Sequence, residues 1–419
     1  MQIVIEADQM VIGDGSPPVA DAAVVIGEGR IHYAGPAAGA PRDRSAQVIQ
    51  ARGGTVLPGL IDVHVHITND GGPGKTAAVL GDAFEAAADL AMRGYANALV
   101  SLHAGYTTLR NLHAPLFADV AVRDAIAAGR LEGPRLVVCG QGLCVTGGHM
   151  DRGNLADHVA VSGRIGVCDT PDEFRRAVRQ MAKRNVDFIK INSDVGSMLD
   201  PAAPYVPEMS FAEMEAACSE AHRLGLHVAA HTAGGPPIEE ALAAGVDTIE
   251  HGHWLTDRAI ELMLGRDASY VPTLIVNSRN FAYDRETLGV SERSWHWLQA
   301  AYDAKWSSME RAHKAGVTIA AGSDAGFLVN HGENACELEE LVKGGLTPNE
   351  AIRATTGSAA KLLGLNDAIG TLEAGKQADV VVVNGDPLTD ITLLQRLDHI
   401  THVLKDGRIV KAPHDLLQA

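Results

Sequence analysis

Eight short runs rich in β-branched and other apolar residues recur through the middle of this 419-residue chain, and helix-like stretches separate them. Strands that alternate with helices build parallel sheets, and eight such units fit a closed (β/α)8 barrel. The sequence therefore predicts an α/β fold with a TIM-like barrel. The runs occupy residues 56–66, 105–110, 135–140, 186–192, 226–231, 246–251, 269–274 and 317–324.

The two ends of the chain have a different pattern. Residues 1–55 contain short alternating segments broken by glycine turns, and the tail returns to this pattern around residues 378–387. The length allows a barrel of roughly 200–300 residues together with a second unit. We therefore expect residues 1–55 and 366–419 to form one composite β-sandwich domain, with the (β/α)8 barrel of residues 56–365 inserted between them.

Charge and composition exclude some partners. The formal net charge of −17 disfavours nucleic acid and anionic membrane surfaces, which bind basic faces. The five cysteines are an odd number without CxxC spacing, which indicates free thiols in a reducing compartment. The sequence has neither a signal-peptide pattern nor a window of about 18 consecutive apolar residues. We expect a cytoplasmic protein that binds neither nucleic acid nor membrane.

A His-x-His pair closes the first barrel run. His64 and His66 lie two positions apart at the end of an apolar segment. Alternate residues of a strand share one face, so the two imidazoles can bind one metal ion. The simpler interpretation is that they are two polar residues of a half-buried strand.

Four further ligand-type side chains end later runs. Lys190 lies in an otherwise apolar strand, where a buried ammonium needs a salt bridge or a chemical change such as carbamylation by CO2. His231 and His251 end the fifth and sixth runs, and for each taken alone a satisfied polar residue is favoured over a ligand. Asp324 ends the eighth run and could simply cap the following helix. In a barrel all of these positions converge on the C-terminal strand ends, the usual place of an active site.

This donor set predicts a metal site. Imidazoles, one carboxylate and one carbamate, without any thiolate, suit Zn²⁺, with Mn²⁺ or Co²⁺ as substitutes. Two metal ions that share a hydroxide provide a nucleophile near neutral pH and polarise a carbonyl group. We therefore expect a two-metal site, which Lys190 could bridge if it is carbamylated rather than held in a salt bridge.

Several motifs together resemble the amidohydrolase superfamily over nearly the whole chain. The resemblance is greatest to its imidazolonepropionase-like and Xaa-Pro dipeptidase (prolidase)-like branch, which includes dipeptidases, N-acyl amino acid hydrolases and amidohydrolases that cleave ochratoxin A. The superfamily motifs lie at residues 58–66, 188–191, 231, 250–252, 322–326 and 375–379, and those of the branch at 133–135, 146–149 and 346–353.

The resemblance implies a role for each ligand. It places His64, His66 and Asp324 on one metal ion, places His231 and His251 on the other, and makes Lys190, as a carbamate, the bridge. It also implies a homo-oligomer, with an octamer as one candidate state. Asp324 is then also catalytic, because it accepts the proton of the attacking hydroxide and passes it to the leaving amine.

The same resemblance gives His149 a catalytic and substrate-binding role, holding the substrate carbonyl or carboxylate, although a solvated loop histidine is the alternative. Two positions depart from the pattern. Arg110-Asn111 stands where relatives often have Arg-Asp, and Thr232 follows the fifth-strand ligand where many relatives carry a ring residue. The substrate contacts of any one relative therefore cannot be transferred whole.

The candidate substrate contacts are apolar and cationic. Phe327, Leu328 and Val329 follow the eighth run and would offer an apolar surface near the metal ions, or instead pack against the barrel rim. Arg110 and Arg279 are the candidate cations for a substrate carboxylate.

These features favour a binuclear amidohydrolase that cleaves N-acyl amino acids or dipeptides with a hydrophobic or aromatic C-terminal residue. Ochratoxin A, which would be cleaved to ochratoxin alpha and phenylalanine, is a candidate substrate of this form. The alternatives are an Xaa-Pro or Xaa-Arg/Lys dipeptidase, a mononuclear imidazolone-type ring hydrolase or deaminase, and a non-catalytic scaffold.

Overall fold

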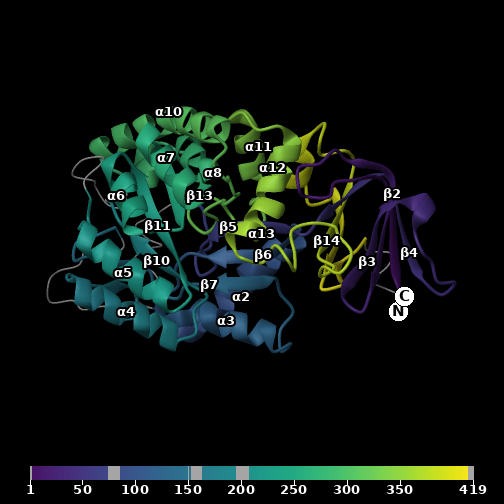
Figure 1. Ribbon diagram of the computed structural model, residues 1–419, viewed down its shortest axis with the longest axis horizontal. Coiled ribbons are helices and arrows are strands. Elements are labelled where there is room, and N and C mark those ends of the chain that lie inside the picture. Colours follow the sequence, from purple (N-terminus) through teal and green to yellow (C-terminus); the bar gives the residue numbers. More distant parts are fainter. Residues whose placement is uncertain (1, 74–84, 150, 152–162, 195–206, 414–419) are drawn as a thin grey trace.

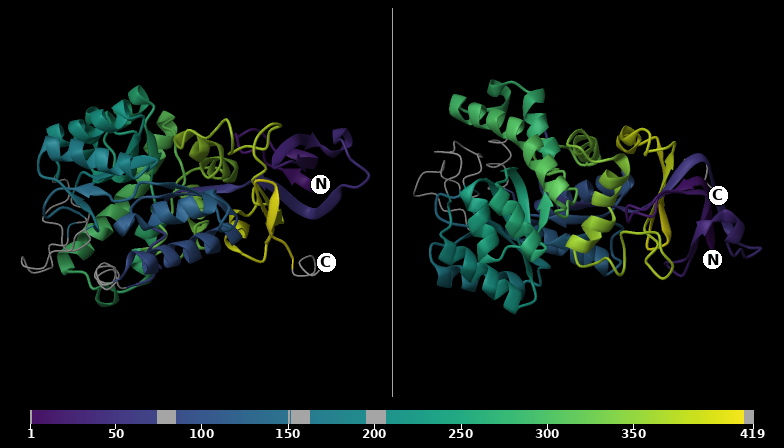
Figure 2. Two further views of the ribbon diagram at one scale, coloured as in Figure 1. Left: turned by 90° about the horizontal axis from the view of Figure 1, so that it is seen from below. Right: turned by 45° about the horizontal axis from the view of Figure 1, so that its top comes forward.

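The computed structural model describes residues 2–73, 85–149, 151, 163–194 and 207–413, and it has two lobes (Figure 1). One lobe holds the terminal strands and the other holds the parallel strands with their helices. Two further views show the same division, with the purple and yellow strands of the two chain ends together at one side (Figure 2).

The terminal lobe is built on one seven-stranded mixed sheet in the order β16-β15-β14-β4-β1-β2-β3. Strand β14 of the tail pairs antiparallel with β4, so the two chain ends join in one sheet. The sheet curls, because Ile31 donates its backbone N–H to Lys376 and the turn at Gly29 contacts the turn at Gly407. Its strands are β1 (Ile3–Met10), β2 (Val19–Gly27), β3 (Arg30–Pro36), β4 (Gln47–Pro58), β14 (Val380–Asn384), β15 (Ile400–Lys405) and β16 (Arg408–Lys411).

The barrel lobe contains two groups of parallel strands. One is ordered β5-β6-β7 and the other β13-β12-β11-β10-β8-β9. Their bounds are β5 (Leu60–Val65), β6 (Tyr106–Asn111), β7 (Arg135–Val138), β8 (Leu143–Cys144), β9 (Gly166–Val167), β10 (Phe188–Asn192), β11 (His227–Gly234), β12 (Thr248–Trp254) and β13 (Ser269–Val271).

Backbone hydrogen bonds close these two groups into a barrel. Asp187 donates to the carbonyl of Val138 at 2.8 Å, which joins β10 to β7. The segment 317–324 bridges the other gap: Tyr270 donates to Thr318 at 2.9 Å, and Val63 donates to Ala321 at 3.0 Å. The predicted TIM-like barrel with a β domain from both ends is therefore confirmed.

The eighth run differs from the expected regular strand. It makes an isolated parallel bridge at Ile319 instead of a full ladder. Gly322 packs so closely on His64 that an added Cβ would lie 2.6 Å from the Cβ of that histidine, and Asp324 has a φ of +56°. Left-handed backbone breaks the extended geometry of a strand, so the run ends in a turn that directs Asp324 inward.

Helices surround the barrel and follow the amphipathic pattern of its outer layer. Among the described residues, the helices of four or more residues are α2 (Ala87–His103), α3 (Ala118–Ala127), α4 (Pro171–Lys183), α5 (Phe211–Arg223), α6 (Pro236–Ala244), α7 (Asp257–Arg266), α8 (Leu274–Arg279), α9 (Arg285–Leu288), α10 (Glu292–Ala315), α11 (Cys336–Lys343), α12 (Pro348–Ala354) and α13 (Gly357–Leu362). The longest of them, α10, crosses the barrel lobe beside α8, which follows the seventh strand (Figure 1).

Candidate active site

Three predicted ligands meet at the C-terminal ends of the first and eighth strand positions. His64 lies on β5 and His66 directly follows that strand, and Asp324 follows segment 317–323 beside them. The Nε2 atoms of His64 and His66 lie 3.5 and 3.2 Å from Oδ1 of Asp324. All three side chains are buried, and their ligand atoms lie within 4.8 Å of one another. This spacing can hold a metal ion.

A buried carboxylate, that of Glu250, fixes the orientation of His64. Its Nδ1 lies 2.8 Å from Oε2 of Glu250, and Oε1 of the same carboxylate accepts from the guanidinium of Arg110 at 2.7 Å. An Nδ1–H that donates to a carboxylate leaves the lone pair on Nε2, the atom that faces Asp324. Burial alone would raise the pKa of Glu250, but Arg110 and His64 hold it well below its usual range.

His251 is oriented in the same way by a hydroxyl group. Its Nδ1 lies 2.7 Å from Oγ1 of Thr273, and that hydroxyl donates to the carbonyl of Pro272 at 2.8 Å. The hydroxyl must therefore accept from the imidazole, which leaves Nε2 of His251 able to bind a metal ion. Burial holds the pKa of His251 well below its ordinary value, so the ring is neutral.

Lys190 and His231 lie on the same wall. Nζ of Lys190 and Nε2 of His231 are buried and have no hydrogen-bond partner among the described residues. The ring centroid of His231 lies 4.4 Å from that of His251, which in turn lies 5.1 Å from that of His64. Burial lowers the pKa of Lys190 to about 8. Unpaired buried nitrogens are rare in proteins, so these atoms fit a site completed by metal ions.

The backbone is strained at three positions of this site. Asp324, His251 and Thr273 have φ values of +56°, +73° and +46°. Non-glycine residues rarely adopt this region, and such outliers concentrate at functional sites. The strain supports a functional assignment for the strand ends, where the fold would otherwise favour ordinary extended backbone.

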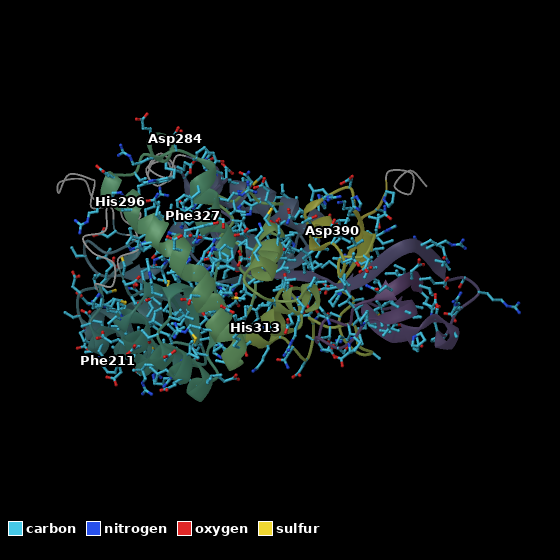
Figure 3. All side chains as sticks on the ribbon, turned by 90° about the horizontal axis from the view of Figure 1, so that it is seen from above. Phe211, Asp284, His296, His313, Phe327 and Asp390 are labelled. Atoms are coloured by element: carbon cyan, nitrogen blue, oxygen red, sulfur yellow. The ribbon has the colours of Figure 1, made fainter. Side chains whose placement is uncertain are left out.

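A cleft of about 830 Å³, including its open mouth, lies over these groups. All six predicted metal ligands line it, together with His149 and Phe327. The ring of His149 stacks on that of His231 with a centroid distance of 3.9 Å, and its backbone N–H donates to Glu208. Phe327 packs against His66 with a centroid distance of 4.6 Å. In Figure 3, Phe327 lies over the barrel lobe, far from Asp390 in the terminal lobe.

The other predicted substrate contacts do not line this cleft. Arg110 is buried at the opposite end of the barrel interior, where it pairs with Glu250, and its positive charge is thereby used within the core. Leu328 and Val329 are fully buried in the hydrophobic core. Arg279 lies outside the cleft lining and pairs with Glu333 at 3.2 Å. The expected substrate contact is therefore not seen for these four residues. Leu328 and Val329 are packed in the core, and Arg110 and Arg279 are held by ion pairs.

Several cleft residues were not singled out from the sequence. His253 follows His251 on β12 at the same two-residue spacing as the His64 pair, a signal that was present in the sequence. Asn192 and Ala233 lie at the C-terminal ends of β10 and β11. The others lie on helices and loops whose approach to the cleft is a tertiary feature: Leu112, His113, Val276, Asn277, Asn280, Trp297 and Leu298.

Together, the closed barrel and the buried cluster of histidines, lysine and aspartate at its strand ends are typical of (β/α)8 hydrolases. A model of the amidohydrolase family matches residues 55–410, and the chain belongs to this family. Members are generally metal-dependent, which agrees with the His64–His66–Asp324 group.

Known relatives support the branch as well as the family. The ochratoxinase of Aspergillus niger is 33% identical over 430 residues, which cover 98% of this chain and 87% of that protein. Its crystal structure matches with a TM-score of 0.87 at 31% identity, covering 99% and 96% of the two chains. The crystal structure of a Xaa-Pro dipeptidase with bound methionine matches with a TM-score of 0.87 at 29% identity, covering 98% and 100%.

An imidazolonepropionase of Salinispora tropica is 25% identical over 412 residues, which cover 92% of each protein. The expected superfamily, its branch and the class of enzyme, a hydrolase of C–N bonds, are thus confirmed. In the part of the chain that the structure describes, no helix is both long and apolar enough to cross a membrane.

Proposed function

We propose that this protein is a binuclear metal-dependent amidohydrolase that cleaves N-acyl amino acids or dipeptides with a hydrophobic or aromatic C-terminal residue. Ochratoxin A, an amide of phenylalanine, is included as a candidate substrate, since the Aspergillus niger relative is an ochratoxinase. The single observation that carries the proposal is the buried amine of Lys190, which has no partner among the described residues yet lines the cleft with the five other candidate ligands.

The donor set divides into two groups. His64, His66 and Asp324 would hold one metal ion, and His231 with His251 would hold the other. Lys190, as a carbamate, would supply oxygen ligands to both. Bound Zn²⁺, Mn²⁺ or Co²⁺ would activate water near neutral pH and polarise the amide carbonyl. A mononuclear ring hydrolase would leave the buried Lys190 without a function.

Asp324 would transfer the proton, and His149 would bind the substrate. Hydrolysis adds water across the amide, and the leaving nitrogen must gain a proton to depart as an amine. The Asp324 carboxylate would accept a proton from water and return it to that nitrogen. His149, stacked on His231, lies where it can hold the substrate carbonyl or carboxylate.

The cleft itself favours an apolar substrate side chain. Leu112, Val276, Leu298 and Phe327 line it, whereas the described lining contains no carboxylate besides Asp324. A cationic C-terminal residue would therefore be buried without a free counter-charge, which argues against an Xaa-Arg/Lys dipeptidase. An Xaa-Pro dipeptidase is a second candidate, because the solved relative with that activity matches over the full length of both chains.

A substrate panel tests the proposal. N-acyl amino acids, Xaa-Pro and other dipeptides, and ochratoxin A are incubated with the Zn²⁺-loaded protein, and release of the C-terminal residue is measured. Full burial of an apolar side chain contributes about 1.5–3 kcal/mol, which is about ten- to a hundredfold in kcat/KM. Preferred cleavage before Lys or Arg, or of ring amides alone, would contradict the proposal.

The oligomeric state and the cellular location are proposals. We propose a homo-oligomer, with an octamer as one candidate state, and a cytoplasmic location. Light scattering at micromolar concentration tests the first, and only monomer in that measurement would contradict it.

A further inference from the structure

The cleft has a second region of polar atoms beside the proposed metal ligands. His253 on β12, Asn277 on α8 and Trp297 on α10 all line it. Nδ1 of His253, Oδ1 of Asn277 and Nε1 of Trp297 are buried and have no hydrogen-bond partner among the described residues. Buried polar groups without partners are costly and uncommon. Three of them on one cleft wall indicate a ligand that supplies the missing partners.

Aromatic packing holds the first and third of these side chains. The ring of His253 lies 6.0 Å from that of Trp297 and 5.9 Å from that of Trp254, and the two indoles are 5.5 Å apart. The rings meet edge to face, a favourable arrangement for aromatic pairs. Figure 3 labels His296 and His313 towards the two ends of α10, and the cleft lies at the His296 end, next to Trp297.

A buried ionic network fixes the helix that carries Asn277. Glu337 accepts from the backbone N–H groups of Leu274 and Ile275 at 2.9 and 2.7 Å, which anchors the first turn of α8. Lys305 donates to the carbonyl of Leu274 at 2.8 Å and lies 3.4 Å from Glu340. A site whose supporting groups are satisfied in this way is preorganised for binding.

The chemistry of this wall selects an uncharged group. Among the described cleft residues, only the proposed metal ligands Lys190 and Asp324 are lysine, arginine or carboxylate side chains. The nearby Lys305 already donates to the carbonyl of Leu274 on α8 and pairs with Glu340 on α11. An indole N–H only donates, whereas an imidazole and an amide can each donate and accept. The matching ligand group therefore accepts at least one hydrogen bond, can donate another, and carries no charge.

We infer that His253, Asn277 and Trp297 form a specificity subsite for the phenol group of an aromatic substrate side chain. The inference rests on the proposed amidohydrolase function and deepens it. The apolar part of that side chain would pack against Val276 and Leu298, which line the same cleft.

Matched substrate pairs test the subsite. We expect kcat/KM to be about tenfold higher for N-acetyl-tyrosine than for N-acetyl-phenylalanine, as hydrogen bonds to otherwise unpaired buried groups predict. N-acetyl-glutamine and N-acetyl-methionine form a second pair, in which we expect no preference for the amide because the proposed substrate side chain is apolar or aromatic. A ratio of one or less in the tyrosine pair, or a tenfold preference for glutamine over methionine, would overturn the inference.

Variants show whether these residues cause the preference. Asn277→Leu removes hydrogen-bonding atoms with little change of shape, and Trp297→Phe removes the indole N–H but keeps an aromatic ring. Each should bring the preferred ratio close to one. Val276→Ala is the matched control, because it changes the apolar wall and should leave the ratio intact. Thermal unfolding verifies that each variant is folded. Unchanged ratios in folded Asn277→Leu and Trp297→Phe would refute the subsite.

Binding separates this inference from the proposed function. Calorimetry with N-acetyl-tyrosine and N-acetyl-phenylalanine needs no turnover. If the protein hydrolyses no amide in the panel, the proposed function fails, yet tenfold tighter binding of the tyrosine compound that is lost in Asn277→Leu would still support the subsite. Equal binding of both compounds would reject the subsite whether or not amides are cleaved.

Discussion

Nδ1 of His64 lies 2.8 Å from Oε2 of Glu250, and Oε1 of the same carboxylate lies 2.7 Å from Nη2 of Arg110. A residue of the second strand thus acts on a candidate metal ligand of the first strand through a carboxylate of the sixth. Arg110, expected at the substrate, instead fixes the charge of Glu250, which orients the imidazole. The three side chains are nearly inaccessible to solvent, so this relay lies in the barrel core.

Replacing Glu250 should therefore damage both metal binding and stability. Glu250→Gln removes the negative charge that Arg110 and His64 share, and a buried arginine without its partner costs about 3–5 kcal/mol. Loss of the orienting carboxylate should weaken metal binding about 10–100-fold. Urea unfolding and Zn²⁺ titration measure the two effects. Glu261→Gln, on the exposed side of α7, is the control and should change neither quantity.

Lys190 should be required for two metal ions per chain. Lys190→Ala is expected to lower the metal content from about two equivalents towards one and to abolish hydrolysis, with partial rescue by short carboxylic acids that replace a carbamate. Elemental analysis of chelator-free protein gives the count, and mass spectrometry detects the added CO2. Lys183→Met, at the exposed end of α4, should leave both unchanged. A fully active wild-type protein with one equivalent of metal would contradict the binuclear proposal.

A mutation should separate the two proposed roles of Asp324, metal ligand and proton carrier. Asp324→Asn keeps an oxygen donor beside His64 and His66 but cannot accept a proton, so much of the metal should remain. The rate should fall by about 10²–10⁴-fold, the usual contribution of a positioned acid or base. Metal content and kcat, measured on the same preparation and against the exposed Asp367→Asn control, test this. Turnover near that of the wild type would assign proton transfer to another group.

Lys305 should make stability depend on pH in the alkaline range. Burial lowers its pKa from 10.5 to about 8, so between these values the unfolded chain binds more protons than the folded one. Stability should therefore rise with pH from about 8 to 10.5, by up to about 3 kcal/mol relative to Lys305→Met, which lacks the titrating amine. Urea unfolding at several pH values gives this difference. Lys314→Met, exposed on the same helix, should follow the wild type. A stability difference between wild type and Lys305→Met that does not change with pH would contradict the explanation.

Local sequence patterns predicted the barrel and its candidate ligands. Alternating apolar runs and helical stretches indicated strands whose C-terminal ends meet, so His64, His66, Lys190, His231, His251 and Asp324 could be expected around one cleft, and all six line it. A strand of period two and the rule that parallel strands end on one side of a sheet suffice for this inference. The pairing of the two chain ends followed from similar reasoning and appears as the β4–β14 ladder.

Only the tertiary structure decided which other side chains reach the cleft. Leu328 and Val329 have the same apolar character as Phe327, yet they are buried in the core while Phe327 borders the cleft. Arg110 and Arg279 are attractive cations in the sequence, but Glu250 and Glu333 pair with them. The hydrophobicity and charge of a residue indicate which kinds of group it can contact. Which group it does contact depends on the direction of its loop and on the position of residues distant in sequence, such as a carboxylate. For the same reason the polar wall of His253, Asn277 and Trp297 comes from three separate elements, and its assembly depends on how α8 and α10 pack over β12.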